Sequence, residues 1–342
     1  MSTKTATGRI LVTGGTGFIG SHVVRRLIDR GEDVVLVTRS GSARKNLADL
    51  DFEERQGDLT DPDAVRRAVE GCDRVYHIAG HIATAKREAG RVFDSNLAAT
   101  RNVFEACREA GVKRVMYLAS IFALGGGEQK PFREDDPYNL SDLGIDYFNA
   151  KRQAELLAYD FLDQGLPIVF VYPNYCFGPG DVYVSSSRPL LGMLNGELPA
   201  YITGGLNAMD VRDAAEGLIL GMDKGKVGRK YLIGGDNLQW SEFFDRVSQV
   251  SGLPAPRLKL PRGLASFSGG LIERVQKEPL IDRAAAEIAG RYWFYDDSRA
   301  REELGYHSRP LEEALRDGIR WFAANGYVKP RRLKRLPPQL RG

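Results

Sequence analysis

The chain has 342 residues, 43% of them hydrophobic and 27% charged, which is the balance of a globular protein with a large buried core. Three cysteines without paired spacing indicate neither a disulfide framework nor a structural zinc site, and we expect no bound metal. The net charge of +3 comes from the last residues, because residues 327–342 hold six basic side chains and no acid. The mildly acidic remainder argues against nucleic-acid binding. Since the start lacks an apolar core and no run of about 18 apolar residues follows, we expect a cytoplasmic protein.

The first half alternates short apolar runs with helical patterns, which is typical of a parallel sheet covered by helices on both faces. The sequence predicts strands at residues 9–13, 34–38, 75–79, 114–119 and 168–172, and helices at 18–30, 93–110 and 147–164. Asp61 as N-cap and Pro62 at the first helical position predict a further helix. We therefore expect a doubly wound α/β domain over residues 1–173, to which parts of residues 201–233 return.

Beyond Pro173 the alternation breaks, and glycine, serine and proline become frequent up to about residue 205. This pattern predicts a smaller mixed α/β lobe over residues 174–326 that binds the substrate. A predicted helix at 264–275 belongs either to the core of this lobe or to a lid over the substrate. The basic tail at 327–342 is expected to be solvated and partly disordered, and weak contact with an anionic membrane surface is the alternative.

A glycine-rich turn follows the first predicted strand. Residues 11–20, LVTGGTGFIG, satisfy G-x-x-G-x-x-G through Gly14, Gly17 and Gly20. Glycine permits a sharp turn into the helix and lets the backbone approach a pyrophosphate, to which the helix N-terminus presents free N–H groups. Because the turn lies between a strand and a helix within the first 30 residues, it predicts a dinucleotide site in a Rossmann fold.

The end of the second predicted strand indicates which dinucleotide binds. Residues 38–42 contain Arg39 but no Asp or Glu that would accept a hydrogen bond from a ribose 2′-hydroxyl. A guanidinium can form two hydrogen bonds with a 2′-phosphate, so we expect NADP(H). The alternative is that Arg39 stacks on the adenine, which would permit NAD(H) as well.

Tyr147 and Lys151 stand four residues apart, on one face of a predicted helix. A fixed ammonium favours the phenolate of a neighbouring tyrosine, whose ordinary pKa of about 10 makes it a poor acid–base group at neutral pH. Ser120 follows the predicted strand at 114–119, at the edge where open α/β sheets bind ligands, and its hydroxyl can hold a substrate oxygen. We therefore expect Ser120, Tyr147 and Lys151 to be catalytic.

This order of glycine turn, serine, tyrosine and lysine resembles the extended short-chain dehydrogenase/reductase family over about residues 9–323. The segments GDLTD at 57–61, HIAG at 77–80, NLAATRN at 96–102 and YPNYCFGPG at 172–180 are similar to further motifs of that family, although Ala99 stands where glycine is usual. The resemblance implies a homodimer formed through the helices at 93–110 and 147–164. It also implies cofactor contacts from Gly14, Thr16, Gly17, Phe18, Ile19, Arg39, Asp58, Leu59, Ala79, Gly80, Asn96, Tyr147, Lys151, Pro173 and Asn174.

The C-terminal residues 296–306 and 311–322 resemble the dihydroflavonol-reductase-like branch, which includes bacterial proteins labelled hopanoid-associated sugar epimerases. Asp210 and Arg212 replace the histidine and aspartate usual in that branch, a departure that bears on the substrate. The expected function is an NADP(H)-dependent carbonyl reductase or alcohol dehydrogenase acting on an apolar small molecule, such as a sterol-like, isoprenoid-like or flavonoid-like ketone. A nucleotide-sugar epimerase is the alternative, and a non-catalytic NADP(H)-binding protein is a third possibility.

Several other side chains are candidates for the surroundings of the site. An apolar pocket is favoured by the aromatic residues Phe122, Tyr138, Phe148, Tyr175, Tyr183 and Tyr201. His81 and Lys86 follow a predicted strand and are candidates to line the site, whereas His22 is expected to pack and His77 is expected to be a strand residue.

Overall fold

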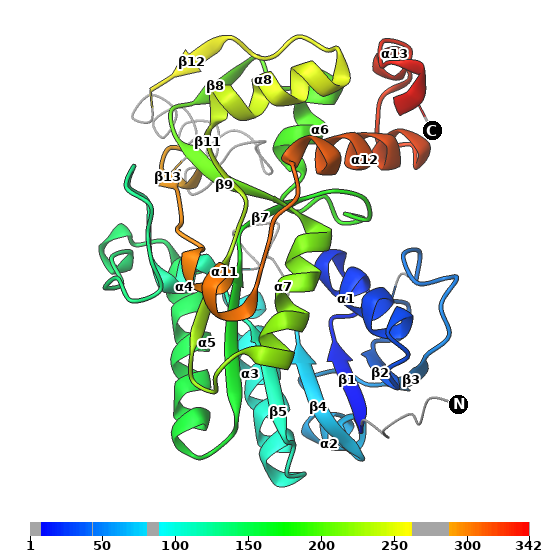
Figure 1. The fold of residues 1–342 in the computed structure, drawn as a ribbon, viewed down its shortest axis with the longest axis vertical. Coiled ribbons are helices and arrows are strands. Elements are labelled where there is room, and N and C mark those ends of the chain that lie inside the picture. The colour runs from blue at the N-terminus through cyan, green and yellow to red at the C-terminus, as the bar shows by residue number, and fades with distance from the viewer. Residues whose placement is uncertain (1–7, 43, 81–88, 262–286, 342) are drawn as a thin grey trace.

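Seven parallel strands form the main sheet of the protein, in the order β10-β6-β5-β4-β1-β2-β3. The structure is a computed structural model that describes residues 8–42, 44–80, 89–261 and 287–341 (Figure 1). The expected helix at 264–275 and the candidates His81 and Lys86 lie outside the described residues. The strands are β1 Arg9–Thr13, β2 Val34–Thr38, β3 Glu53–Gln56, β4 Cys72–His77, β5 Arg114–Leu118, β6 Ile168–Pro173 and β10 Lys230–Ile233.

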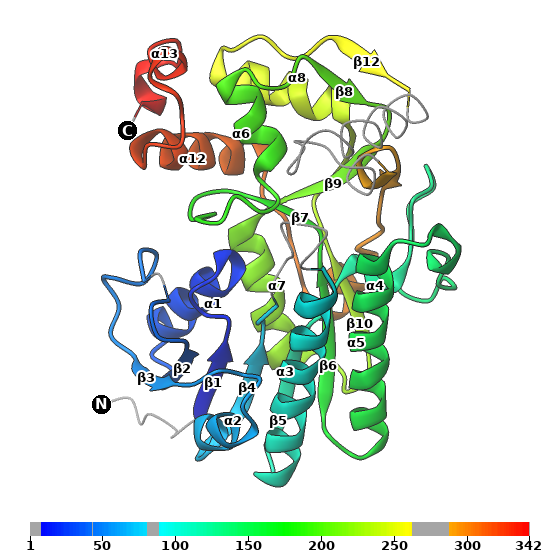
Figure 2. The same ribbon diagram turned by 180° about the vertical axis from the view of Figure 1, so that it is seen from behind.

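Helices cover both faces of this sheet. One face carries α2 Pro62–Val69, α3 Ala89–Glu109 and α5 Asp146–Asp163, and the other carries α1 Phe18–Asp29, α7 Val211–Lys224 and α11 Ser298–Leu304. Of these, α7 and α11 lie in front of the sheet in Figure 1, and α3 and α5 lie in front of it in Figure 2. Because side chains alternate along a strand, Val35 and Val37 pack toward α2 while Val34 and Leu36 pack toward α1. The predicted doubly wound α/β fold is confirmed.

A smaller mixed lobe lies beyond the carboxyl ends of the strands, where β6 continues into β7. Its four-stranded sheet contains β7 Tyr175–Phe177, β9 Gly205–Asp210, β11 Asp236–Gln239 and β13 Tyr292–Trp293, and a two-stranded sheet pairs β8 Ala200–Ile202 with β12 Leu258–Leu260. Its helices are α6 Arg188–Asn195, α8 Trp240–Ser251 and α12 Leu311–Ala324. A separate buried core, which includes Phe177, Phe243 and Phe322, holds these elements together. None of the helices within the described ranges is long and apolar enough to cross a membrane.

Some elements differ from those that the sequence predicts. Strand β3 and the short helix α4 (Ile121–Leu124) were not predicted, α3 begins at Ala89, and β4 runs from Cys72 to His77. β3 reads Glu-Glu-Arg-Gln and is only partly buried, so it lacks the apolar pattern by which strands are recognised. It forms because the backbone of β2 offers hydrogen bonds to an edge strand.

The C-terminal segment is folded, in contrast to the expected disordered tail. A short helix, α13 (Pro330–Leu333), and a single turn of 3-10 helix, η3 (Pro338–Leu340), follow α12. Leu336 and Leu340 are each only 1% exposed and pack in the core of the smaller lobe. These two leucines hold the segment in place although most of its other side chains are polar or charged.

Candidate active site

The turn between β1 and α1 has the geometry of a phosphate cradle. Gly14 has a φ of +71°, and a Cβ atom there would lie 2.7 Å from the backbone nitrogen of Ala79. A Cβ atom on Gly20 would lie 2.1 Å from the carbonyl oxygen of Gly14, so neither position accepts a side chain. Gly17 precedes α1 without a side-chain cap, which leaves the first N–H groups of the helix to bind an anion. The cradle therefore fits the pyrophosphate of a dinucleotide.

A buried chain of hydrogen bonds joins the carboxyl ends of β1 and β4 to α3. Thr13 Oγ1 lies 2.9 Å from His77 Nδ1 and accepts hydrogen bonds from the N–H groups of Ile78 and Ala79, both at 3.2 Å. His77 Nε2 lies 3.1 Å from Thr100 Oγ1. Because Thr13 already accepts two hydrogen bonds, we assign its hydroxyl as the donor to Nδ1 and place the ring proton on Nε2. Burial lowers the pKa of His77 to about 4, so the neutral ring supports the cradle, and His77 is the last residue of β4, as expected of a strand residue.

Asp58 and Leu59 lie on a hydrogen-bonded loop that follows β3. The Asp58 carboxylate accepts hydrogen bonds from the backbone N–H and the hydroxyl of Thr60, each at 2.8 Å, and these bonds lower its pKa. The carbonyl of Leu59 accepts a hydrogen bond from Asn102 Nδ2 on α3 at 2.9 Å. Arg39 is exposed directly after β2, and its charge makes a smaller contribution to the lowered pKa of Asp58. Asp58 and Arg39 therefore lie near one another at this corner of the sheet.

A carboxylate does lie at the end of β2, which the sequence does not predict. β3 places Glu54 beside Leu36, where one carboxylate oxygen accepts a hydrogen bond from Thr38 Oγ1 and the other pairs with Arg44. The sequence could not place Glu54 here because β3 itself was not predicted. Both oxygens of Glu54 already have partners, so they are not free to accept a hydrogen bond from a ribose hydroxyl. Arg39 is exposed directly after β2 and carries the charge that a cofactor would meet there.

Ser120, Tyr147 and Lys151 come from neighbouring elements. Ser120 follows β5 and caps α4, and its Oγ accepts a hydrogen bond from the N–H group of Phe122 at 3.3 Å. α5 carries Tyr147 in its first turn and Lys151 in the next, and α4 packs against α5. Lys151 Nζ lies 5.6 Å from the centroid of the Tyr147 ring, and a Cβ atom on Gly80 would lie 3.8 Å from the same nitrogen. The ammonium therefore lies close to both the phenol ring and the segment that follows β4.

Burial opposes a charge on both members of this pair. It raises the pKa of Tyr147 to about 12 and lowers the pKa of Lys151. Burial is the cause of the Tyr147 shift. Tyr147 consequently holds its proton at neutral pH in this structure.

Aromatic side chains gather beside Tyr147 and form what we call the aromatic wall: Phe122, Phe148, Tyr175 and Trp293. The Phe122 ring centroid lies 5.6 Å from that of Tyr147, 5.1 Å from that of Phe148 and 4.8 Å from that of Trp293. The Tyr175 ring meets Phe122 edge to face at 6.4 Å. Burial, followed by the nearby phenol of Tyr147, raises the pKa of Tyr175. Phe148 and Trp293 are fully buried, so the partly exposed Phe122 and Tyr175 form the face of the wall beside Tyr147, and Tyr175 adds one hydroxyl to it.

Part of this wall was expected from the sequence and part was not. Phe122, Phe148 and Tyr175 belong to it, but Tyr183 is 64% exposed and Tyr201 packs against a phenylalanine of α8. Tyr138 lies half-buried beneath the guanidinium of an α5 arginine. Trp293 was missed because it lies about 170 residues after Phe122. The dense aromatic run YWFY at 292–295 was the signal that could have found it.

Asn174 offers a buried acceptor at the end of β6, directly after Pro173. It is 6% exposed, and its Nδ2 donates a hydrogen bond to the carbonyl of Ile233 at 3.0 Å. Its Oδ1 has no hydrogen-bond partner in the described part of the chain. Buried polar atoms are normally paired, so this oxygen is suited to an N–H donor of a ligand such as a carboxamide.

The expected cofactor contacts share one edge of the main sheet, because the carboxyl ends of parallel strands lie together. Thr16, Phe18 and Ile19 belong to the glycine turn and the start of α1, and Asn96 lies half-buried on α3. The remaining residues follow β2, β3, β4 and β6 or lie in the first turns of α5. The fold therefore gathers side chains that are up to 160 residues apart in the sequence.

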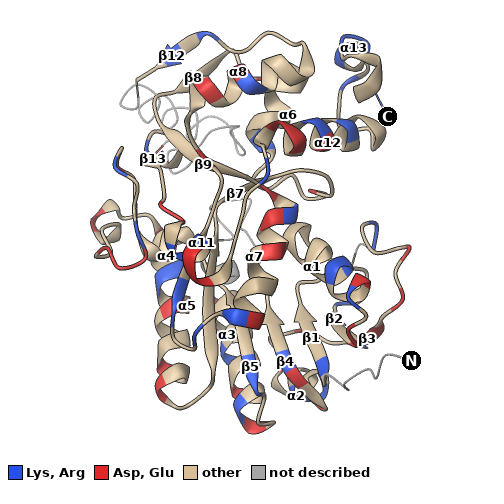
Figure 3. Ribbon diagram, viewed as in Figure 1, with Lys and Arg blue, Asp and Glu red and all other residues tan. Residues whose placement is uncertain are grey.

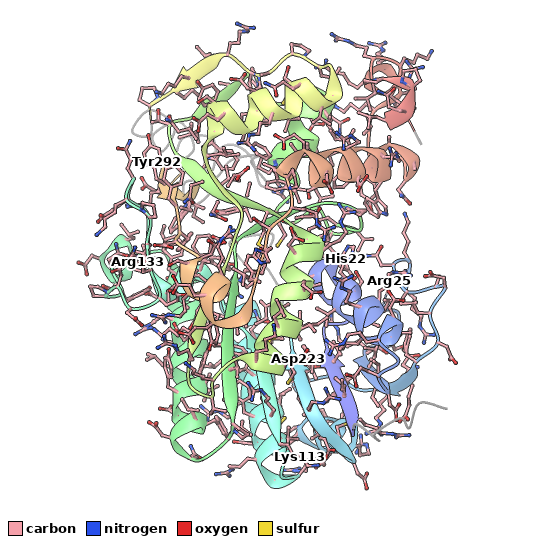
Figure 4. The ribbon with its side chains drawn as sticks, viewed as in Figure 1. His22, Arg25, Lys113, Arg133, Asp223 and Tyr292 are labelled. Atoms are coloured by element: carbon pink, nitrogen blue, oxygen red, sulfur yellow. The ribbon has the colours of Figure 1, made fainter. Side chains whose placement is uncertain are left out.

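His22 and the unusual pair Asp210 and Arg212 have structural contacts. His22, labelled near the top of α1 in Figure 4, donates a hydrogen bond from Nε2 to the carbonyl oxygen of Pro179 at 2.9 Å. Buried Asp210 caps α7 and pairs with Arg212, which also reaches Asp317 of α12 at 2.8 Å. The first contact joins α1 to the segment after β7, and the others join α7 to α12, so the departure from the family pattern lies in a network between the lobe and a helix that covers the sheet.

Most of the chain matches one protein family. Residues 10–234 match the model described as the NAD dependent epimerase/dehydratase family. A putative dihydroflavonol 4-reductase from Synechocystis sp. is 33% identical over 331 residues, which cover 93% of this chain and 95% of that protein. Sterol demethylase protein B from Methylococcus capsulatus is 30% identical over 325 residues, which cover 93% and 99% respectively.

The fold of a solved structure agrees with this family match. The crystal structure of PA4631, a nucleoside-diphosphate-sugar epimerase from Pseudomonas aeruginosa, has a TM-score of 0.80 and 29% identity, and the match covers 94% of this chain and 99% of that chain. The resemblance to extended short-chain dehydrogenases, and to their dihydroflavonol-reductase-like branch, is confirmed. This chain therefore belongs to the NAD-dependent epimerase/dehydratase family of nicotinamide-dependent enzymes.

Proposed function

We propose that this chain is an NADP(H)-dependent carbonyl reductase or alcohol dehydrogenase whose substrate is an apolar ring compound. The observation that carries the proposal is the aromatic wall beside Tyr147. Phe122 and Tyr175 are the members of the wall with exposed surface, and burying one large apolar group of a flat ring system against such side chains stabilises its binding by about 1.5–3 kcal/mol. The names of the two relatives, a dihydroflavonol reductase and a sterol demethylase protein, support a ring substrate.

The three candidate catalytic side chains divide the work of reduction. A nicotinamide bound along the sheet edge would supply the hydride. Tyr147, neutral at pH 7 because burial raises its pKa to about 12, donates its proton to the carbonyl oxygen as that oxygen gains negative charge. Ser120 can donate a second hydrogen bond to the same oxygen, since its Oγ accepts from Phe122 and its hydroxyl hydrogen is not committed to that contact. Lys151 places a positive charge beside the phenol ring and Gly80.

The charges at the end of β2 support the preference for NADP(H). Arg39 is exposed there, while the nearby carboxylate of Glu54 is occupied by Thr38 and Arg44. An exposed guanidinium attracts a 2′-phosphate, whereas a ribose 2′-hydroxyl would need a free acceptor. The family name and the glycine turn are equally compatible with NAD(H), so the charge of Arg39 is the specific support.

A nucleotide-sugar epimerase is a second candidate, favoured by the similarity to the Pseudomonas aeruginosa epimerase. Such a substrate carries a diphosphate, which needs lysine or arginine side chains of the smaller lobe to bind it. The segment between β7 and α6 carries no cation, and Arg188, the first residue of α6, is exposed. The segment's buried Asp181 accepts hydrogen bonds from Ser185 and Ser187 and adds negative charge instead. These contacts support the reductase over the epimerase.

The fate of the hydride tests the proposal. A reductase must release spent cofactor after each turnover, so the purified protein should lose its cofactor on dialysis. With a panel of ring ketones it should consume NADPH in a one-to-one ratio with product, and Tyr147→Phe should abolish this consumption. Cofactor that survives dialysis, together with isomerisation of a sugar nucleotide and no net change in reduced nicotinamide, would instead establish the epimerase.

A further inference from the structure

The folded C-terminal segment presents a row of basic side chains to solvent. Residues 327–341 contain six cations and no acid, and α13 carries blue segments in the charge view of Figure 3. Arg331, Lys334 and Arg335 are exposed, and their side chains make no hydrogen bond or ion pair with any residue that the structure describes. Since Leu336 and Leu340 anchor the segment, these charges are held at fixed positions.

A shallow hollow beside α13 adds to this positive surface. It is lined by Asn195, Lys329, Pro330, Arg331 and Arg332. Lys329 forms an ion pair with Glu197 at 2.9 Å, so one of the three cations that line the hollow is balanced by an acid. The guanidinium of Arg332 occupies the space that a side chain at Gly196 would fill, which keeps this cation close to the end of α6. The hollow is therefore positively charged and partly preformed.

A second exposed segment lies at the same end of the molecule. Leu258 of β12 is 61% exposed and stands between Arg257 and Lys259, which are also exposed. Figures 1 and 2 both place β12 and α13 at the end of the long axis that is farthest from the main sheet. The exposed acids in the same region are Glu242 and Asp245 of α8, Glu197 after α6 and Glu313 of α12, and they are outnumbered by the cations of these two segments.

We propose that this end of the smaller lobe docks on a membrane surface that contains anionic phospholipid. Cations near such a surface are attracted to its headgroups, and an exposed leucine flanked by cations can enter the apolar boundary beneath them. A nucleic acid would be attracted by the cations alone and would gain nothing from Leu258. The combination of a fixed basic row with an exposed leucine therefore favours a lipid surface. This inference does not depend on the reaction that the enzyme catalyses.

Co-sedimentation of the full chain with vesicles tests the proposal. The protein should bind phosphatidylcholine vesicles that contain phosphatidylglycerol, should not bind pure phosphatidylcholine, and should bind less at high salt. Each cation near the surface contributes about fivefold to affinity, so Arg331→Gln, Lys334→Gln and Arg335→Gln combined should weaken binding on the order of 100-fold. Leu258→Ser should weaken it about tenfold, because one leucine no longer enters the membrane.

The matched control removes the same charge from the opposite end of the molecule. Arg67→Gln, Arg108→Gln and Lys113→Gln combined should leave vesicle binding within a few-fold of the natural protein, and Figure 4 labels Lys113 far from the smaller lobe. An unchanged thermal midpoint for each variant would establish that the fold is intact. Equal loss of binding in both triple variants, equal binding to neutral and anionic vesicles, or displacement from vesicles by duplex DNA at low concentration would overturn the proposal.

Discussion

Tyr147 should keep its proton far above neutral pH when the cofactor is absent. Burial raises its pKa to about 12 from an ordinary value of 10.0. A shift of about two units corresponds to about 3 kcal/mol in favour of the neutral phenol. At pH 7 the phenolate should therefore make up on the order of 10⁻⁵ of the population.

Ultraviolet difference titration isolates this residue. Subtracting the spectrum of Tyr147→Phe from that of the natural protein leaves the phenolate absorbance of Tyr147 alone. We expect no such absorbance up to about pH 10, since fewer than about one molecule in a hundred would be ionised there. Tyr183→Phe is the matched control, because it removes a phenol that is 64% exposed and outside the aromatic wall.

Turnover completes the test of Tyr147. A positioned acid–base group contributes at least about 10²-fold, so Tyr147→Phe should reduce ketone turnover by that factor while cofactor affinity changes only a few-fold. Tyr183→Phe should leave both unchanged. A phenolate that titrates near neutral pH and disappears in Tyr147→Phe would refute the dominance of burial, and near-normal turnover of that variant would refute its role as the acid.

Three further predictions concern the cradle, the cofactor and the substrate. Because the pKa of His77 is about 4 in the fold and 6.5 when unfolded, the unfolded chain binds more protons between those values. The free energy of unfolding should thus fall by about 3 kcal/mol from pH 6.5 to pH 4, and urea titrations of His77→Gln should lack this part of the loss. Arg39→Asp should shift the ratio of NADPH to NADH affinity at least about tenfold toward NADH in calorimetric titrations, and tighter binding of NADH by the natural protein would contradict the proposal. Tyr175→Asn should raise the KM for a ring ketone about tenfold with less change in kcat, whereas an unchanged KM would exclude Tyr175 from the substrate site.

The parts of the fold that follow a strong local pattern could be predicted from the sequence. β1 and β2 begin and end at the predicted residues because their side chains are buried on both faces and read as continuous apolar runs. The glycine turn was found because its backbone leaves no room for a Cβ atom at Gly14 or Gly20. Asp61 and Pro62 marked the start of α2, where the Asp61 side chain accepts a hydrogen bond from the backbone N–H group of Asp63.

Features that depend on pairing between distant segments could not be predicted in this way. β3 carries mostly charged side chains, so only its hydrogen bonds with β2 define it as a strand. Its Glu54 then brings a carboxylate to the end of β2 that no local pattern indicates. Trp293 contacts Phe122 from β13 of the smaller lobe, about 170 residues along the chain, and Leu336 and Leu340 are buried only because α12 and its neighbours provide a core for them.

The protonation of Tyr147 bears on the choice between the two candidate reactions. An epimerase oxidises and then reduces its substrate within one turnover, so its acid–base group must accept a proton as readily as it returns one. Such a group works best with a pKa near the working pH, and a pKa of about 12 leaves almost no base at pH 7. Ketone reduction needs only the acid, and an alkoxide that forms on the substrate is a stronger base than a phenolate, so proton transfer from Tyr147 is favourable. Alcohol oxidation at the same site would need the base, as epimerisation does, so a protonated Tyr147 favours the reductive direction. Burial among aromatic side chains therefore has two consequences. It suits an apolar ketone, and it keeps on Tyr147 the proton that reduction of the ketone requires.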